Sequence, residues 1–478
     1  MCIKLKEYVI NKVNEKVYEY TLDNNLKVFI VRKPNFNKKV VFYETKYGSV
    51  NNCFAQIGET KLKKYPFGIA HFLEHKLFES KDGIDYFKLF QKNGAYINAA
   101  TSYDKTYYFF SCSDNFLINL ENLLNLVENP YFTDQNVEKE KGIIGQEIDM
   151  YKNRASEVLY KTLYYNCFNK DYRKYDIAGE KEDIKKITKE DLYECYNTFY
   201  NPSNMFLTIV GDIDVSKTID LIKKHENKRK IIKNDKIIEE EIKEKYEVCK
   251  KEEVIYHNVE NEKVGYLYKL FRDKQDDVSM RKANLIIRIF INSRFGRLSL
   301  FEDYLIKNNL VKSYFDYSID ISEKYILLGF DYDPIDDLKV KKLIDEKLNN
   351  MNNLKEEFEL YKKTRLVNFI NAFEKVDEVA TVIRQSYECF GKIVLDDYDV
   401  IKGLTYDEYI SYIKKLDFNN YTKVIVKPNK SINEKEENMK DKKCNCKDTC
   451  TCGCKEGKKC TCKDKNCKCE KSNDKKNS

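Results

Sequence analysis

The chain has 478 residues, of which 42% are hydrophobic and 34% charged, a balance typical of globular proteins long enough for two or more domains. No run approaches the roughly 18 apolar residues of a membrane helix, and the N-terminus lacks a secretory signal, so we expect a cytoplasmic protein without a membrane partner. The net charge of +7 lies mostly in residues 431–478, and the nearly neutral remainder argues against nucleic-acid binding.

The first part of the chain alternates between strand and helix patterns. Residues 17–48 alternate in polarity and are rich in Val, Tyr, Phe and Thr, as half-buried strands are. The segments that follow are punctuated by Asn-Gly and Asn-Pro pairs, which end helices. Helices are predicted over 68–78, 85–90, 117–127, 133–153, 156–168 and 188–199, and strands over 96–100, 106–111 and 205–210.

A stretch dense in lysine and glutamate, about 223–253, has few apolar anchors, and we interpret it as a solvated helical or irregular connector. Strand and helix patterns then begin again. Strands are predicted over 266–271, 314–319 and 325–331, and helices over 279–290, 298–307, 338–351 and 354–373. The pattern predicts an α+β fold with domains at 1–225 and 251–430, a charged linker at 226–250 and a tail at 431–478.

The segment His71-Phe72-Leu73-Glu74-His75 holds two of the four histidines of the chain. On a helix, residues four apart share a face, so both imidazoles can reach one metal ion. Glu74 lies slightly to one side of the helix face that the two histidines share. There a base can reach a metal-bound water without itself becoming a ligand. The alternative at this point is an ordinary packed pair of core histidines.

A hydrolytic zinc usually has three protein ligands, so the two histidines require a third from elsewhere. The predicted helix at 133–153 offers Glu140 and Glu147, which lie two turns apart on one face. Glutamates at such positions ordinarily form a solvated helix face. The spacing alone leaves both readings open.

Four sequence blocks in order resemble the pitrilysin/insulinase family of inverted-motif (HxxEH) zinc metallopeptidases, which includes the mitochondrial processing peptidases. Within the family the chain resembles a bacterial processing-peptidase-like member. The blocks are Gly68–Phe78, Asn93–Ser102 followed by Thr106–Tyr108, Val137–Tyr151, and Asn201–Met205 followed by Val210–Ile213.

The resemblance implies a role for each candidate residue. His71, His75 and Glu147 would be ligands of one catalytic Zn²⁺, Glu74 the general base, and Glu140 an acid that supports the site. The strand segment Asn98, Ala99 and Ala100 would bind an extended peptide substrate as an added strand, through main-chain hydrogen bonds.

The resemblance also implies two similar α/β-roll half-domains, with helices packed on mixed or antiparallel sheets, that enclose a cleft or chamber. The implied function is that of a metalloendopeptidase that hydrolyses unfolded peptides or protein segments by Glu-assisted attack of zinc-bound water. Many family members place an arginine and a tyrosine of the second half opposite the zinc, but Leu305 and Lys312 occupy those places here.

Three interpretations of that departure follow. Lys312 or Tyr314 substitutes for the missing groups, or a related partner subunit supplies them in a homodimer or heterodimer. Alternatively, the chain is a weak or inactive family member that binds peptides or assists an active subunit.

The tail carries a Cys-x-Cys array with almost no apolar residue, in the style of a metallothionein. Such thiolates bind Zn²⁺ or Cu⁺, and nine of them suffice for roughly three tetrahedral divalent ions. The alternative is a disordered, oxidisable tail without a dedicated role. The cysteines are Cys444, Cys446, Cys450, Cys452, Cys454, Cys460, Cys462, Cys467 and Cys469.

Overall fold

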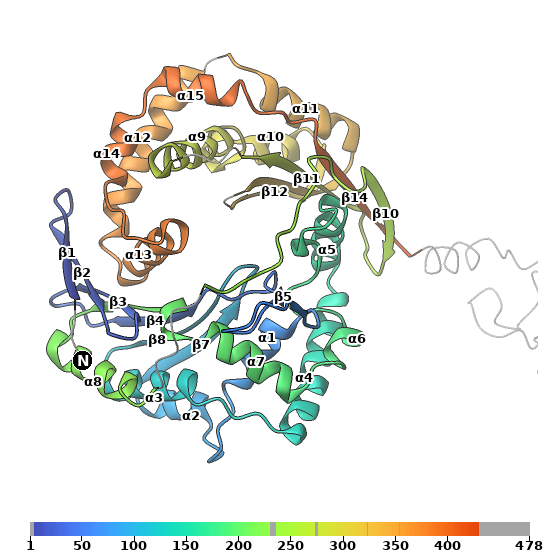
Figure 1. Ribbon diagram of the computed structural model, residues 1–478. Coiled ribbons are helices and arrows are strands. Elements are labelled where there is room, and N and C mark those ends of the chain that lie inside the picture. The colour runs from blue at the N-terminus through green and yellow to red at the C-terminus, as the bar shows by residue number, and fades with distance from the viewer. Residues whose placement is uncertain (1–3, 230–235, 273–275, 323, 353, 430–478) are drawn as a thin grey trace, which may run out of the picture.

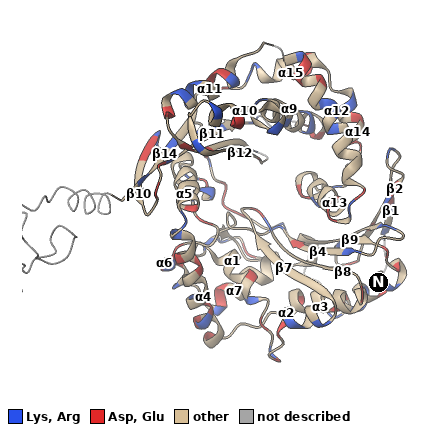
Figure 2. Cartoon of the chain, turned by 180° about the vertical axis from the view of Figure 1, so that it is seen from behind, with Lys and Arg blue, Asp and Glu red and all other residues tan. Residues whose placement is uncertain are grey.

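The computed structural model describes residues 4–229, 236–272, 276–322, 324–352 and 354–429. Two sheets, one from each part of the chain, lie on opposite sides of a ring-like outline (Figure 1). Lysines, arginines and acidic residues are interspersed over the helices of both halves, as the nearly neutral charge of the body leads one to expect (Figure 2). Within the described residues, no helix is both long and apolar enough to cross a membrane.

The first half is built on a seven-stranded sheet with the order β1-β2-β3-β9-β4-β8-β7, in which only β3 and β9 are parallel. Its strands are β1 (Lys4–Ile10), β2 (Glu15–Thr21), β3 (Lys27–Arg32), β4 (Lys39–Thr45), β7 (Ala95–Thr101), β8 (Thr106–Cys112) and β9 (Met205–Gly211). A small separate hairpin pairs β5 (Cys53–Phe54) with β6 (Lys63–Lys64).

Helices cover one face of this sheet and form the largest core with it. They are α1 (Ile69–Lys76), α2 (Tyr86–Lys92), α3 (Phe116–Glu128), α4 (Asp134–Lys152), α6 (Lys181–Ile184), α7 (Lys189–Phe199) and α8 (Val215–Glu226). Thr133 and Thr188 cap α4 and α7 with capping boxes, which satisfy the free N–H groups at the helix starts.

The second half has a five-stranded sheet with the order β10-β14-β11-β13-β12, in which β10 and β14 are parallel. The strands are β10 (Glu252–His257), β11 (Lys263–Phe271), β12 (Val311–Ile321), β13 (Tyr325–Pro334) and β14 (Tyr421–Pro428). The helices are α9 (Asp277–Phe295), α10 (Phe301–Lys307), α11 (Asp337–Asn349), α12 (Leu354–Ala372), α14 (Asp397–Gly403) and α15 (Tyr406–Ile413). The predicted α+β class is confirmed.

Several elements differ from the sequence prediction, and two regions show why. The helix predicted over 298–307 begins only at Phe301, because Leu300 adopts a left-handed conformation with φ 53°. Residues 376–428, for which the pattern predicted no element, form three helices and a strand. The first of them, α13 (Val376–Phe390), is strongly amphipathic, with Val379, Ala380 and Ile383 buried.

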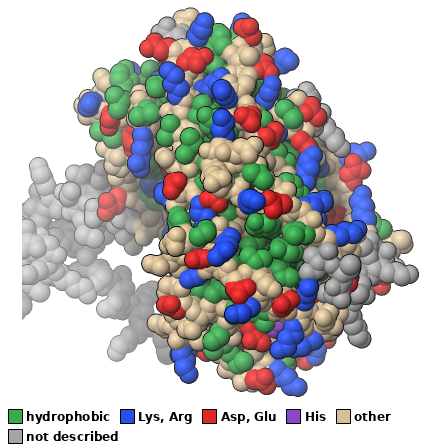
Figure 3. Space-filling model, turned by 90° about the vertical axis from the view of Figure 1, so that its left-hand side faces the viewer, with side chains coloured by type: hydrophobic (Ala, Val, Ile, Leu, Met, Phe, Trp, Pro, Cys, Tyr) green, Lys and Arg blue, Asp and Glu red, His purple; other side chains and the backbone are tan. Residues whose placement is uncertain are grey.

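Each half contributes one helix that packs on the sheet of the other half. α13 packs its apolar face on the first sheet, against Phe29 and Phe206. In return α5 (Ala155–Cys167) packs Leu159 and Leu163 on β11 and β14 of the second sheet. These helices close the two sides of the ring in Figure 1. The side on which β1, β2 and α14 lie gathers hydrophobic side chains at mid-height, among charges of both signs (Figure 3).

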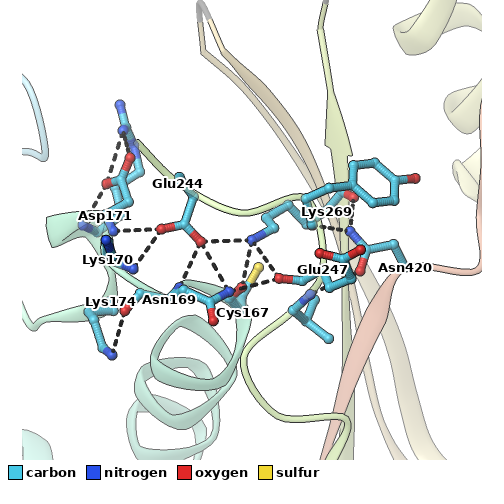
Figure 4. Close-up of polar contacts among 12 residues, drawn as sticks. Cys167, Asn169, Lys170, Asp171, Lys174, Glu244, Glu247, Lys269 and Asn420 are labelled. Atoms are coloured by element: carbon cyan, nitrogen blue, oxygen red, sulfur yellow. Dashed lines mark hydrogen bonds and ion pairs between the residues drawn. The ribbon is translucent and has the colours of Figure 1, made fainter. Parts of the chain in front are cut away.

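The connector at 236–251 is irregular and largely exposed, as predicted, but the side chains of Glu244 and Val248 are buried. Glu244 is 1% exposed and accepts hydrogen bonds from the backbone N–H groups of Asn169, Lys170 and Asp171, at 2.7, 2.6 and 2.8 Å. Its other partner is Lys269 of β11, at 3.0 Å (Figure 4). The connector is therefore anchored to both halves at this point.

Candidate metal centre

The candidate metal centre is built on α1, whose start depends on a glycine. Gly68 has φ 85°, and a Cβ there would lie 2.3 Å from the carbonyl oxygen of Ala178. Only glycine tolerates both conditions. From this start Phe72 and Leu73 enter the core, while His71 and His75 stay half-buried on the side next to α4.

Three side chains converge between α1 and α4. Nε2 of His71 and Nε2 of His75 lie 3.9 and 3.6 Å from Oε2 of Glu147. One ligand atom from each residue lies within 4.8 Å of the others. Ligand atoms of a tetrahedral zinc lie roughly 3.3 Å apart, so small side-chain adjustments suffice to hold an ion.

The donor set fits zinc chemically as well. Nδ1 of His71 and Oε2 of Glu147 are buried and have no hydrogen-bond partner, an expensive state for polar atoms unless something else binds the groups. Burial lowers the pKa of His71 to about 3, so the ring is neutral and can act as a ligand. Two imidazole nitrogens with one carboxylate oxygen is a set typical of catalytic zinc.

Two further carboxylates complete the centre. Burial disfavours the charge on His75, yet the hydrogen bond from its Nδ1 to Oε1 of Glu140 (3.1 Å) and the nearby carboxylates raise its pKa. Glu74 is 7% exposed, and its Oε2 accepts a 2.6 Å hydrogen bond from the hydroxyl of Thr101. Burial raises the pKa of Glu74, and the Thr101 bond partly offsets this. The structure thus brings together all five residues named from the motif and the α4 helix.

The strand predicted to bind substrate, β7, is one of the two edge strands of the first sheet and contacts α1. Asn98 is exposed on it, and its Oδ1 accepts a 2.9 Å hydrogen bond from the N–H of Ala99. Its Nδ2 donates to the hydroxyl of Tyr96 at 3.1 Å. The N–H of Ala99 at this edge of the sheet is thus satisfied by the neighbouring side chain of Asn98.

The second-half residues lie in different settings. Leu305 is fully buried in the core of the second half, so its side chain cannot reach a substrate. Nζ of Lys312 donates to Oδ1 of Asn261 at 2.5 Å. The hydroxyl of Tyr314 accepts a 3.3 Å hydrogen bond from Lys263. The nine tail cysteines, 444–469, lie outside the described residues.

Thr101 is the residue that sequence reasoning missed. It lies in one of the sequence blocks, but nothing in the spacing connects position 101 to position 74. The connection depends on β7 and α1 packing together.

Two family models match the chain. "Insulinase (Peptidase family M16)" matches residues 54–181, a range that contains His71, Glu74, His75, Glu140 and Glu147. "Peptidase M16 inactive domain" matches residues 186–364. An uncharacterized zinc protease of Bacillus subtilis, YmfH, is 35% identical over 417 residues, which cover 86% of this chain and 96% of the relative. The beta subunit of human mitochondrial-processing peptidase is 28% identical over 162 residues, 33% of each chain.

Solved structures share the fold. A putative M16-like peptidase from Alicyclobacillus acidocaldarius superposes with a TM-score of 0.79 at 24% identity, covering 90% of this chain and 99% of that one. A protease from Helicobacter pylori gives a TM-score of 0.74 at 20% identity, covering 90% and 100%. The arrangement of two α+β halves is therefore a shared architecture.

Proposed function

Since this chain belongs to the insulinase family, peptidase family M16, we propose that it is a zinc-dependent endopeptidase that hydrolyses unfolded peptides or protein segments. The observation that carries the proposal is the convergence of His71, His75 and Glu147 beside the buried carboxyl of Glu74. The zinc proteases among its relatives support the metal.

His71, His75 and Glu147 would hold the zinc, and Glu140 would orient His75 through the hydrogen bond to its Nδ1. When bound, zinc supplies a Lewis acid that polarises the scissile carbonyl and lowers the pKa of water toward neutrality. Every proton movement falls to the protein. Oε2 of Glu74 is held by Thr101, which leaves Oε1 to accept a proton from the attacking water. The same carboxyl then returns that proton to the departing amine nitrogen.

The substrate would add to β7 as a further antiparallel or parallel strand. The N–H of Ala99 is the group to which a peptide carbonyl would bind, and Asn98 occupies it in the free protein. The incoming peptide would displace the side-chain oxygen of Asn98 from this N–H. Asn98 is exposed, so its side chain can then hydrogen-bond to water. Small side chains at Ala99 and Ala100 let two backbones approach closely.

The decisive experiment is Glu74→Gln. The variant keeps the shape of the side chain but cannot accept a proton, so we expect unchanged zinc content and a loss of peptide hydrolysis of about 10²–10⁴-fold. Glu138→Gln is the matched control, because that side chain is 69% exposed on the same helix as Glu147. Undiminished hydrolysis by Glu74→Gln would refute the proposal.

A second candidate function follows from the second half. Leu305 is buried and Lys312 is engaged with Asn261, so neither offers the family's arginine or tyrosine. The chain would then be a peptide-binding subunit that cleaves only with a related partner, and one relative is named as a subunit. Activity of the purified chain alone would exclude this function, whereas activity that appears only on mixing with a related chain would support it.

A further inference from the structure

The turn between β7 and β8 contacts both helices that pack on the opposite half, α5 and α13. The turn covers residues 102–105 and is closed by the N–H of Ser102 donating to the carbonyl of Lys105 at 2.8 Å. The ring of Tyr103 stacks on Tyr164 of α5, with centroids 5.6 Å apart. Nζ of Lys105 forms an ion pair with Glu388 of α13. Both helices that pack on the opposite half thus contact one short turn.

The turn is seated closely against the chain beneath it. The N–H groups of Ser49 and Val50 donate to the carbonyls of Ser102 and Tyr103 at 3.0 and 2.9 Å. A Cβ on Gly48 would lie 2.5 Å from the backbone of Tyr103, so only glycine permits this contact. Because the packing is tight, a displacement of the turn also displaces the residues that contact it.

The residue immediately before the turn is Thr101, which holds the oxygen of Glu74. Thr101 pairs directly with Thr106 across the hairpin, and their hydroxyl oxygens lie 3.2 Å apart. The hydroxyl of Thr106 donates its single proton to the carbonyl of Tyr47 at 2.8 Å, so this proton does not bridge the two threonines. The hairpin pairing therefore fixes the position of Thr101, and its own hydroxyl proton is donated to Glu74.

The attachment of α13 to the turn belongs to a buried cluster of charges. Arg384 of α13 donates from Nε to Oε2 of Glu44 at 2.9 Å, and its guanidinium lies 4.1 Å from the ring centre of Phe42. Glu388 is 12% exposed and Glu44 is fully buried. Glu388 joins both Lys105 and Arg384, so removing Lys105 leaves the remaining buried charges less fully compensated and loosens the contact between the helix and the turn.

We propose that Thr101 is a positioning residue for Glu74. Lys105 links the orientation of Thr101 to the second half through its ion pair with α13. The inference rests on the proposed function, in which Glu74 moves the proton. Through these contacts the second half would influence the orientation of Glu74 without placing any of its own residues at the metal centre. Misplacing a reacting group by about 1 Å can cost on the order of 10²-fold in rate.

The kinetic test uses Thr101→Val, Thr101→Ser and Lys105→Met. We expect Thr101→Val to lower kcat roughly 10–100-fold with KM and zinc content unchanged, and Thr101→Ser to restore most of the rate. Lys105→Met should lower kcat roughly 3–10-fold, and it should add nothing in a Thr101→Val background, because it acts through Thr101. An unchanged kcat in Thr101→Val would overturn the positioning role, and additive losses would overturn the link.

Lys38→Met is the matched control. Lys38 pairs at 2.7 Å with Asp377 at the other end of α13, so it also joins that helix to the first half but does not contact the turn. Its kcat should equal that of the wild type. A loss equal to that of Lys105→Met would show that any loosening of α13 has the effect, and the specific link would fail.

Hydrogen–deuterium exchange separates this inference from the proposed function, because it needs no activity. Lys105→Met should speed exchange at residues 101–106 and in α1, whereas Lys38→Met should not. Unchanged exchange in Lys105→Met overturns the link even if the enzyme is active. Faster exchange together with equal hydrolysis by wild type and Glu74→Gln would support the link and refute the proposed function.

Discussion

The anchor of the connector makes a quantitative prediction for Glu244→Gln. The carboxylate accepts hydrogen bonds from three backbone N–H groups and from Lys269, whose side chain is fully buried. A glutamine there presents an amide N–H₂ either to the N–H groups of Lys170 and Asp171 or to the N–H of Asn169 and the ammonium group. Either way a buried donor loses its acceptor and Lys269 keeps an unpaired charge.

The magnitude can be reached by two routes. Breaking a buried ion pair by removing one partner costs about 3–5 kcal/mol of unfolding free energy. Independently, burial opposes ionisation of Glu244, but the three N–H donors and Lys269 outweigh it and lower its pKa from 4.5 to about 2. That difference corresponds to about 3 kcal/mol at neutral pH.

The pH dependence has a definite sign. Because the pKa of Glu244 is lower in the folded state, its stabilisation is fully present above about pH 4.5 and is lost as the pH falls toward 2. The stability gap between wild type and Glu244→Gln should therefore narrow between pH 5 and pH 3.

Urea unfolding at pH 7, 4.5 and 3.5 measures this gap. Glu182→Gln is the control, because its pair with Lys185 is exposed (77% and 67%) and is therefore screened by solvent. If Glu244→Gln lost no more stability at pH 7 than Glu182→Gln, or if its gap widened with acid, the reasoning would be refuted.

Two further predictions concern the metal centre and the substrate edge. Gly68→Ala should cost about 3 kcal/mol in urea unfolding and reduce zinc binding, because its Cβ meets a backbone carbonyl. Gly58→Ala has a similar φ of 83° with open space and should cost only about 1 kcal/mol, so equal losses would exclude the steric explanation. Ala99→Pro should raise the KM for peptides several-fold while zinc content stays constant, because it removes the edge N–H. An unchanged KM would argue against strand addition at Ala99.

Much of the candidate site was predictable because its signals are local. His71 and His75 stand four apart on a short helix, and this spacing alone places both rings on one side of it. Glu140 and Glu147 are likewise brought to one face by the period of α4. The alternation of strands and helices was sufficient for the α+β class, which the structure confirms.

The prediction failed where local signals compete or end. Leu300 interrupts a helix by adopting a left-handed conformation, which a leucine rarely does and which its sequence does not announce. The connector reads as solvated because it is rich in charge, yet Glu244 is buried. Composition cannot reveal that three backbone N–H groups of the folded chain donate hydrogen bonds to this one carboxylate.

The sequence by itself determined the periodic features of this protein: the α+β alternation, and the helical spacing that sets His71 beside His75. Only the tertiary structure decided which distant groups meet. It set Glu147 within 4 Å of both rings, placed Thr101 on Glu74, and carried α13 across to the first sheet. The reason is physical. Helical period is a property of neighbouring residues, whereas contacts across tens of residues depend on how buried faces pack together.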